Sequence, residues 1–497
     1  MGNSRAVTAN VEAPPAVDRS FFGQPRGLAT LFGTEMWERF SFYGMRAILV
    51  LFLVAPREDG GFGMAVTTAA AVYAIYNAMV YMLSIPGGWI ADRLWGARRS
   101  VLWGGVVIAA GHYSMAVPAG DAFIWAGLIL IALGTGLLKP NISAIVGGLY
   151  AEEDERRDAG FSLFYMGINL GAFVAPLVCG FLAEKIDWHW GFAAAGVGMT
   201  LALVQYVAGR HHLRGVGERP AHPATASERR VASRGALALL GIAVLLLLLD
   251  AVTEGIEVTH VVTALTLLAV AVPVAFFTAI YRSDLSDAER CRITAFVSFF
   301  LAATLFWMIF DQAGSLLNLF AQDRTDRHLL GFQFPASWFQ SLNPLMIIAL
   351  APLFAALWLR LGSRQPSTAV KFSFGLLGIG LSFAVMGAAA AAAGGGLVSP
   401  AWLLSVYFLQ TCAELCLSPV GLAVTTRLAP VRFGSQTMGL WFLATATGNA
   451  LNTQTVKLID VLPRPVYYGG LGAVAVLAGL CLLTYGTRLR RLMAGVH

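Results

Sequence analysis

The sequence contains few charged residues. Only 12% of its residues are Asp, Glu, Lys or Arg, whereas soluble chains carry about a quarter. Hydrophobic residues make up 57% and form apolar runs about the length of a helix that crosses a bilayer. Transmembrane barrels instead show short segments of alternating polarity. The composition therefore excludes a soluble globular domain and predicts an all-α polytopic membrane protein.

The sequence also lacks the residue patterns of enzymes and sensors. Its five cysteines lie in or beside apolar runs, which favours free packing thiols over a metal site. It contains no His/Asp/Glu metal cluster, no activated Ser or Cys arrangement and no phosphate-binding loop. No segment has the composition of a soluble output domain. We therefore expect neither an enzyme nor a sensor, and no metal or cofactor other than coupling protons.

The first twenty residues lack the apolar core of a signal peptide, so we expect the first span to be retained. The net charge is +6, but the basic residues lie in alternate short loops, and the loops between these hold few basic residues, most of them beside acids. This distribution follows the positive-inside rule and is not a nucleic-acid-binding stripe. We expect a multi-pass protein of the cell (inner) membrane, with both termini cytoplasmic, the lipid bilayer as its surroundings and no nucleic-acid partner.

Fourteen apolar runs occur along the chain, and the polar segment 210–234 separates the first six from the others. The loop ADRLWGARR at 91–99 has a weak counterpart, LRLGSR at 359–364, and removing the runs at 235–281 leaves six plus six. Those two runs have almost no polar residues, which is typical of a lipid-facing or peripheral pair. Two pseudo-symmetric halves imply a site between them near the midplane. The expected division is a tail at 1–25, an N-terminal six-helix bundle at 26–209, a linker with two extra transmembrane helices at 210–290, a C-terminal six-helix bundle at 291–488 and a tail at 489–497.

The first apolar run, at 28–54, contains four ionisable residues, which are Glu35, Glu38, Arg39 and Arg46. On a helix they fall on one side together with Phe42 and Tyr43. Each charge in a membrane span costs roughly 2.5–3.5 kcal/mol on insertion scales. This side must therefore face other helices or a water-filled cavity, and it predicts a functional site.

Three further charged residues, Lys139, Asp311 and Glu414, lie deep in later runs. Apolar residues on both sides of Lys139 exclude simple snorkelling to the membrane surface. Asp311 is positioned to pair with an arginine of the first run. The intramembrane charges are then four acidic and three basic, so that one acid is left over as a candidate for proton uptake.

Burial disfavours the charged form of a carboxyl group, whereas a nearby arginine favours it. A carboxylate whose basic neighbour moves away during a conformational change would therefore bind and release a proton in step with transport. Glu35 and Glu38, beside Arg39, suit this description. Neutral residues could also line the cavity, although for each one alone helix packing is the simpler interpretation. They are Tyr43, Tyr81, Asn169, Asn343 and Trp441.

Five motifs occur in order along the chain, and two of them are highly specific. These two are Glu35-x-x-Glu38-Arg39-Phe-x-x-Tyr43-Gly and Phe161-x-x-Phe164-Tyr165-Met-x-Ile-Asn169-Leu-Gly. The others are GGWIADRLWG at 87–96, FQSLNP at 339–344 and ELCLSP at 414–419. Together they resemble the proton-dependent oligopeptide transporter family of the major facilitator superfamily. The two extra runs look like the pair found in its bacterial members.

The resemblance implies the major facilitator fold, with twelve core helices in two bundles plus two extra helices. It implies a symporter that imports di- and tripeptides with protons by alternating access. Proton coupling would fall to Glu35, Glu38 and Arg39. Substrate-binding residues would be Arg46 and Lys139 for the peptide carboxylate, Tyr43, Tyr81 and Asn169 for further hydrogen bonds, Glu414 and Asn343 for the ammonium group, and Trp307 and Trp441 for the side-chain pockets.

The resemblance also implies two gating pairs between the halves, Arg46 with Asp311 and Lys139 with Glu414. Two departures leave the site more apolar: Phe42 replaces a tyrosine common in the motif, and Phe310 stands where some members have a second acid. The alternative function is proton-coupled carriage of another small solute, such as an amino acid, a peptide-like drug or nitrate. Nitrate needs only cationic partners, so the acidic residues argue against it.

Overall fold

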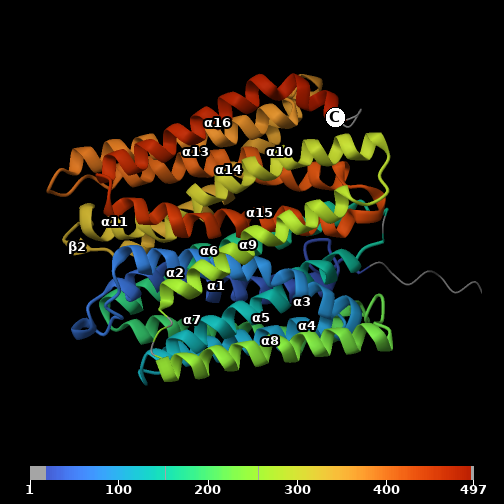
Figure 1. Ribbon diagram of the computed structural model, residues 1–497, viewed down its shortest axis with the longest axis horizontal. Coiled ribbons are helices and arrows are strands. Elements are labelled where there is room, and N and C mark those ends of the chain that lie inside the picture. The colour runs from blue at the N-terminus through green and yellow to red at the C-terminus, as the bar shows by residue number, and fades with distance from the viewer. Residues whose placement is uncertain (1–17, 152, 254, 256, 494–497) are drawn as a thin grey trace, which may run out of the picture.

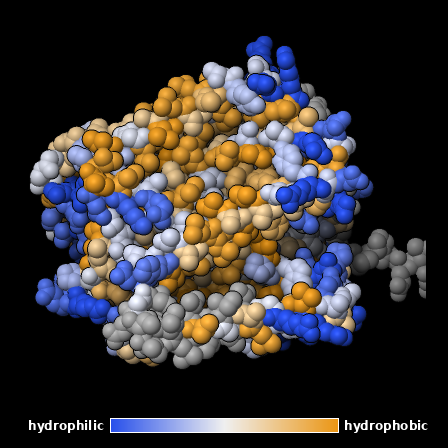
Figure 2. All heavy atoms as spheres, in the orientation of Figure 1, coloured by the Kyte–Doolittle hydropathy of each residue, from blue (hydrophilic) through white to orange (hydrophobic). Residues whose placement is uncertain are grey.

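The computed structural model describes residues 18–493 except residues 152, 254 and 256. Nearly all of this part is helical. Figure 1 shows long helices that run side by side along one axis of the molecule, with short connections at both ends. Figure 2 shows hydrophobic side chains across the middle of the visible face and hydrophilic ones gathered at both ends. This pattern is the one expected of helices that cross a membrane along that axis.

The first half of the chain forms six long helical segments. They are α1 (Arg26–Val54); α2 (Val66–Met82), continued by α3 (Ser84–Ile90) and η2 (Ala91–Trp95); α4 (Ala97–Ala116); α5 (Asp121–Gly148); α6 (Arg156–Lys185); and α7 (Trp188–Gly209). Two short turns, η1 (Arg57–Asp59) and η3 (Arg210–Leu213), lie in the connections. Helices α8 (Ala226–Thr253) and α9 (Val258–Tyr281) then lead to the second half.

The second half repeats this plan with six more segments. They are α10 (Asp287–Phe310), continued by η4 (Asp311–Gly314) and α11 (Leu316–Arg324); η5 (Ala336–Ser341) with α12 (Leu342–Leu361) and η6 (Gly362–Arg364); α13 (Thr368–Ala393); α14 (Ala401–Leu428); η7 (Val431–Phe433) with α15 (Gly434–Thr455) and η8 (Val456–Asp460); and α16 (Arg464–Leu492). Strands β1 (His328–Leu329) and β2 (Phe332–Gln333) form a small antiparallel hairpin between α11 and η5.

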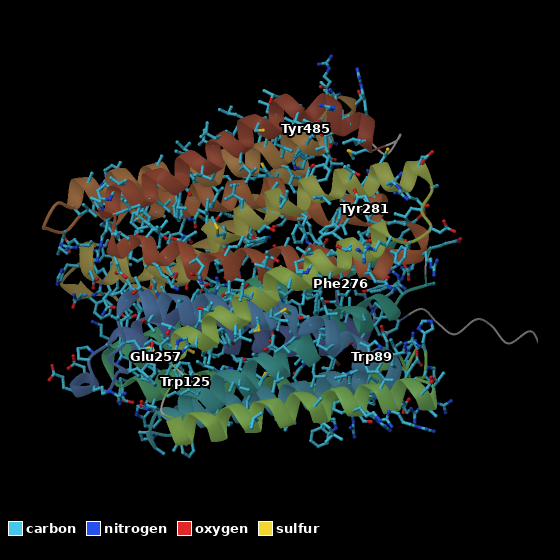
Figure 3. The ribbon with its side chains drawn as sticks, viewed as in Figure 1. Trp89, Trp125, Glu257, Phe276, Tyr281 and Tyr485 are labelled. Carbon is cyan, nitrogen blue, oxygen red and sulfur yellow. The ribbon has the colours of Figure 1, made fainter. Side chains whose placement is uncertain are left out.

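Ten helical segments within the described residues are long and apolar enough to cross a membrane. Helices α1, α4 and α15 are comparably long but more polar, and α1 and α15 bury several charged or amide side chains. With α8 they complete the fourteen expected long helices, which confirms the all-α membrane fold. Figure 3 labels Trp89 and Tyr281 toward one end of the molecule and Trp125 toward the other, where aromatic side chains meet lipid headgroups.

The same helix pairs pack in both halves. Helix α1 lies on α6 and α4 on α5, and correspondingly α10 lies on α15 and α13 on α14. Glycines allow the closest approaches: a Cβ atom on Gly104 of α4 would lie 2.7 Å from the carbonyl oxygen of Gly134 of α5. Helix α13 approaches α16 in the same way, because a Cβ atom on Gly380 would lie 2.8 Å from the Gly472 oxygen. This repeated packing supports the sequence-based division of the chain, which we retain as a proposal.

Helix α9 lies across the boundary between the halves. It packs against α15 and also against α2, and Figure 1 shows it running obliquely over the other helices. Thr266 of α9 shares a hydrogen bond of 2.9 Å with Thr453 of α15, and Thr447 donates to the carbonyl oxygen of Ala269. The apolar sequence of 235–281 had suggested only a peripheral pair. In the structure, α9 is peripheral but contacts both halves.

Candidate functional site

The charged side of α1 points into the protein, as its insertion cost required. Glu35, Glu38 and Arg39 are 3%, 0% and 4% exposed. The Arg39 Nε atom lies 3.0 Å from Glu35 Oε1 and 2.5 Å from Glu38 Oε2. One guanidinium group thus holds two buried carboxylates. One of the two can accept a proton while the other still neutralises Arg39, and this is the arrangement that a proton-handling group needs.

Two turns further along α1, Arg46 pairs with Asp311 of the second half. The Nη2–Oδ1 distance is 2.6 Å, and both side chains are largely buried. Arg46 also donates through Nε to the Tyr73 hydroxyl, and its guanidinium group lies over the rings of Tyr43 and Tyr73. The second carboxylate oxygen of Asp311 accepts a hydrogen bond of 2.5 Å from Asn449. The pair therefore links α1 and α2 of one half to the η4 turn and α15 of the other.

Glu414 and Asn343 meet in the second half. Asn343 Nδ2 on α12 donates to Glu414 Oε2 on α14 at 3.0 Å and to the Thr411 hydroxyl at 3.1 Å. Both Glu414 and Asn343 remain partly accessible. A carboxylate that one amide orients from the side retains lone pairs for a ligand. This corner of the site is suited to bind a cation.

Lys139 has a different partner here from the one that the family resemblance implied. Its Nζ atom lies 3.7 Å from the centroid of the Tyr81 ring, and both side chains are partly accessible. A cation over an aromatic face is held electrostatically while its hydrogen-bond donors stay available. Glu414 bonds Asn343 instead, so in this conformation Lys139 and Glu414 are engaged separately. Their pairing stays a prediction.

The remaining predicted residues differ in burial and in their contacts. Asn169 on α6 is buried and donates to the Tyr165 carbonyl oxygen at 2.9 Å. Trp307 is partly accessible and packs edge-on against Phe306 and Phe310. Trp441 is buried within the second half, where it packs against Phe372 and over Gly421. Trp441 is therefore enclosed by residues of α13 and α14 in this conformation, and its role stays a prediction.

Comparison with known proteins supplies the family. The model of the POT family matches residues 98–468, well over half of the chain. The chain belongs to the POT family. This confirms the resemblance carried by the five motifs, and it confirms that the protein is a carrier and not an enzyme.

Other POT family proteins match this one over nearly its whole length. The di-/tripeptide transporter of Lactococcus lactis subsp. cremoris is 39% identical over 490 residues, which cover 97% of this chain and 99% of the relative. A crystal structure of a peptide transporter POT in complex with sulfate is 46% identical, with a TM-score of 0.93 and coverage of 96% and 98%. A POT family transporter in complex with a thioalcohol-conjugated peptide is 39% identical, with a TM-score of 0.92 and coverage of 95% and 98%. The chain therefore has the major facilitator fold of these POT structures.

Two residues of this POT site were missed from the sequence, Tyr73 and Asn449. Each binds one member of the Arg46–Asp311 pair. A signal for them exists: Tyr73, Asn77 and Tyr81 recur every four residues on α2, so they share one helix face. Asn449 belongs to a similar row of buried polar residues on α15 with Thr445 and Asn452. Rows of neutral polar side chains on an otherwise apolar helix would have marked both positions.

The two halves of this POT protein are joined at the end where Figure 1 labels β2 and α11. Glu184, near the end of α6, accepts hydrogen bonds from the Ala336 amide at 2.7 Å and from the Ser337 amide and hydroxyl at 2.9 and 2.6 Å. Arg327 lies 3.6 Å away. Asn318 on α11 also donates to the Ala47 carbonyl oxygen of α1 at 2.7 Å. The structure is therefore closed at this end.

We expect Glu184→Gln to open this end of the protein. The carboxylate caps the start of η5 and α12, where a negative charge is favoured, and glutamine removes both the charge and one acceptor. Hydrogen bonds to a charged group contribute about 1.5–3 kcal/mol, so the open population should rise by about tenfold or more. Spin labels at Glu58 and Leu330 in a cysteine-free background would report the distance between the halves.

The matched control for this variant is Asp187→Asn. Asp187 is also acidic and near Glu184, but it bonds His189 within its own half. The distance distribution should stay unchanged in the control and gain a longer component in Glu184→Gln. Identical distributions in the two variants would show that Glu184 does not hold the halves together.

Proposed function

We propose that this protein is a secondary active transporter that imports di- and tripeptides together with protons by alternating access. One observation carries the proposal: the partly accessible cations Arg46 and Lys139 belong to the first half, and the partly accessible carboxylate of Glu414 belongs to the second. Arg46 and Lys139 would bind the peptide carboxylate, and Glu414 would bind its ammonium group. A short peptide is a zwitterion, so its two ends need opposite charges at opposite ends of the site.

The proposal extends to side-chain contacts of the peptide. Tyr43, Tyr81 and Asn169 would add hydrogen bonds near the carboxylate, and Asn343 would orient Glu414. Trp307 and Trp441 would bound the pockets for the peptide side chains, although Trp441 must first be exposed by helix movement. The peptide ligand named for one POT relative and the substrates named for the Lactococcus protein support this substrate class.

Protons would be coupled through the cluster of Glu35, Glu38 and Arg39. Its two carboxylates and one guanidinium group carry one excess negative charge, which a single proton neutralises. A buried cluster of net charge is costly in a low dielectric, so proton binding and the surroundings of the cluster must depend on each other. Any movement of α1 that changes those surroundings would then release or take up the proton.

Alternating access would be set by two pairs that form in turn. The Arg46–Asp311 pair is formed in this structure, while Lys139 and Glu414 have other partners. We propose that peptide and proton binding release Arg46 from Asp311 and allow Lys139 and Glu414 to approach. With both termini on the cytoplasmic side, as the positions of the basic loops favour, the closed end of this structure faces outward.

Uptake of labelled dialanine by proteoliposomes tests the function. We expect uptake to depend on an inward proton gradient and to stop when a protonophore collapses it. For one proton per peptide, a gradient of one pH unit corresponds to about tenfold accumulation, so the accumulation ratio also gives the stoichiometry. Liposomes without protein provide the baseline.

Competition separates the proposal from the alternative substrates. Unlabelled di- and tripeptides should inhibit dialanine uptake, whereas alanine and nitrate should not. Inhibition by alanine or nitrate, with none by tripeptides, would contradict the peptide assignment. Uptake of the same size with and without a gradient would contradict proton coupling while leaving the substrate class intact.

A further inference from the structure

Tyr76 on α2 is a buried tyrosine whose hydroxyl forms no hydrogen bond with the described residues. Its side chain is only 5% exposed. A buried hydroxyl without a partner lowers stability, so it requires an explanation other than packing. We propose that Tyr76 is a positioning residue that transmits the protonation state of Glu38 to the Arg46–Asp311 pair. This role rests on the proton coupling proposed above for Glu38.

The Tyr76 hydroxyl lies between the proton-handling cluster and the Arg46–Asp311 pair. A short connection joins α1 to α2, so the two helices run in opposite directions. Tyr73 accepts a hydrogen bond from Arg46 Nε, and the step from Tyr73 to Tyr76 moves about 4.5 Å along α2, away from Arg46 and toward the level of Glu38. Glu38 acts on the Tyr76 hydroxyl electrostatically more strongly than Arg46 does. Tyr76 is therefore placed to respond to both charged groups of α1.

Glu38 supplies an acceptor that is itself without a partner. Its Oε2 atom lies 2.5 Å from Arg39 Nε, whereas its Oε1 atom is buried and accepts no hydrogen bond from the described residues. Phe42, one turn further along α1, presents its ring to Arg39 but has no hydroxyl to donate. A buried donor on Tyr76 and a buried acceptor on Glu38 thus lie on adjacent helices, within electrostatic range of each other.

The pairing of this donor and acceptor depends on the charge of Glu38. An ionised carboxylate is the stronger acceptor, so a slight approach of α2 to α1 would form a charge-assisted hydrogen bond from the Tyr76 hydroxyl to Oε1. Protonation of Glu38 weakens that bond and frees α2. Because α2 also carries Tyr73, its movement removes support from Arg46, which then separates from Asp311. The proton stays on Glu38, and none passes through the tyrosine.

The other ionisable groups around this contact lie on few elements. Arg39 and Glu35 belong to the cluster on α1, and Lys139 of α5 acts electrostatically on Glu38. Helix α15, which packs on α2, contains no ionisable side chain, and α9 carries such side chains only near its two ends. The pH dependence of the contact between Tyr76 and Glu38 is therefore governed by the α1 cluster and by Lys139.

The pH dependence of the closed end tests this role. Spin labels at Glu58 and Leu330 in a cysteine-free background report the distance between the halves there, and we expect acid to add a longer component in the wild type. In Tyr76→Phe this acid-induced rise of the open population should be about tenfold smaller, the factor that corresponds to one hydrogen bond to a charged group. The variant should unfold at no lower temperature than the wild type, because the lost hydroxyl has no partner in this structure.

The matched control is Tyr206→Phe. Tyr206 is 2% exposed and lies in the same half, but its hydroxyl donates to the Arg98 carbonyl oxygen at 3.0 Å. The control should therefore unfold at a lower temperature and keep the full response to pH, which is the reverse of the result expected for Tyr76→Phe. A full response in Tyr76→Phe would overturn the role of Tyr76, and so would an equal loss of response in the control.

The Glu38→Gln background separates this role from the proposed proton coupling. Its side chain can no longer change charge, so the addition of Tyr76→Phe should change the distance distribution no further. An additional change in the double variant would overturn the role by showing that Tyr76 acts through another group. Distances that do not respond to pH in the wild type would overturn the coupling of Glu38 and the role of Tyr76 together. A wild-type response that Tyr76→Phe retains would overturn only the latter.

Discussion

Proton-driven dialanine uptake is expected to fall by about a hundredfold or more in Glu38→Gln. Glu38 is fully buried and lies 2.5 Å from Arg39. Glutamine cannot bind or release a proton, and a side chain positioned for proton transfer typically contributes about 10²–10⁴-fold to a rate. Uptake into proteoliposomes under an imposed pH gradient measures this loss.

A counterflow assay shows whether Glu38→Gln loses only the coupling of peptide transport to protons. Exchange of labelled for unlabelled dialanine needs no net proton movement, so Glu38→Gln should retain it. Asp121→Asn is the control, because Asp121 forms an exposed pair with Arg57 in the same half and should leave uptake unchanged. Normal gradient-driven uptake by Glu38→Gln would remove Glu38 from proton coupling. If Glu35→Gln alone lost uptake, the proton would be assigned to Glu35.

Glu414→Gln is expected to weaken dialanine binding by about tenfold to a hundredfold. A hydrogen bond to a charged group contributes about 1.5–3 kcal/mol, and the proposed ammonium contact is one of this kind. Glutamine retains the size of the side chain and an oxygen that Asn343 can bond. Isothermal titration of the purified protein with dialanine measures the change in affinity.

N-acetyl-dialanine tests whether the effect of Glu414→Gln on affinity depends on the ammonium group of the peptide. Wild type and variant, each with the free and the acetylated peptide, form a thermodynamic cycle. The acetylated peptide has no ammonium group, so the wild type should bind it poorly, and Glu414→Gln should bind it no more weakly than the wild type does. Asp460→Asn, an exposed acid of the same half, is the control and should preserve the preference for the free amino terminus. An equal loss for both peptides in Glu414→Gln would show that Glu414 supports the site without contacting the ammonium group.

Much of this arrangement could be predicted from the sequence because charges inside apolar runs are costly and therefore conspicuous. The cost places Glu35, Glu38 and Arg39 inside the bundle, and they are buried there. It also predicts that Asp311 meets an arginine of the first span, and the structure shows Arg46 beside it. Long apolar runs likewise predict fourteen helices, since little else can cross a bilayer.

Neutral partners were harder to predict because a buried tyrosine or asparagine costs little and leaves no strong mark in an apolar run. Tyr73 and Asn449 complete the Arg46–Asp311 pair from α2 and α15, two helices that are remote from each other in the sequence. The different partners of Lys139 and Glu414 depend on the conformation and not on the sequence alone. The position of α9 was unpredictable for a similar reason: its apolar surface fits lipid and a helix seam equally well.

The position of α9 affects which molecules can enter the protein from the lipid, between its two halves. The halves meet along two seams, α2 with α15 and α6 with α12. Among the described residues, α9 packs against both helices of the first seam, and α12 on the second exposes large apolar side chains such as Leu345 and Leu353. If the halves part within the membrane, lipid tails and lipid-soluble molecules would be admitted between α6 and α12 and kept out between α2 and α15. Entry from the lipid would then favour the seam between α6 and α12.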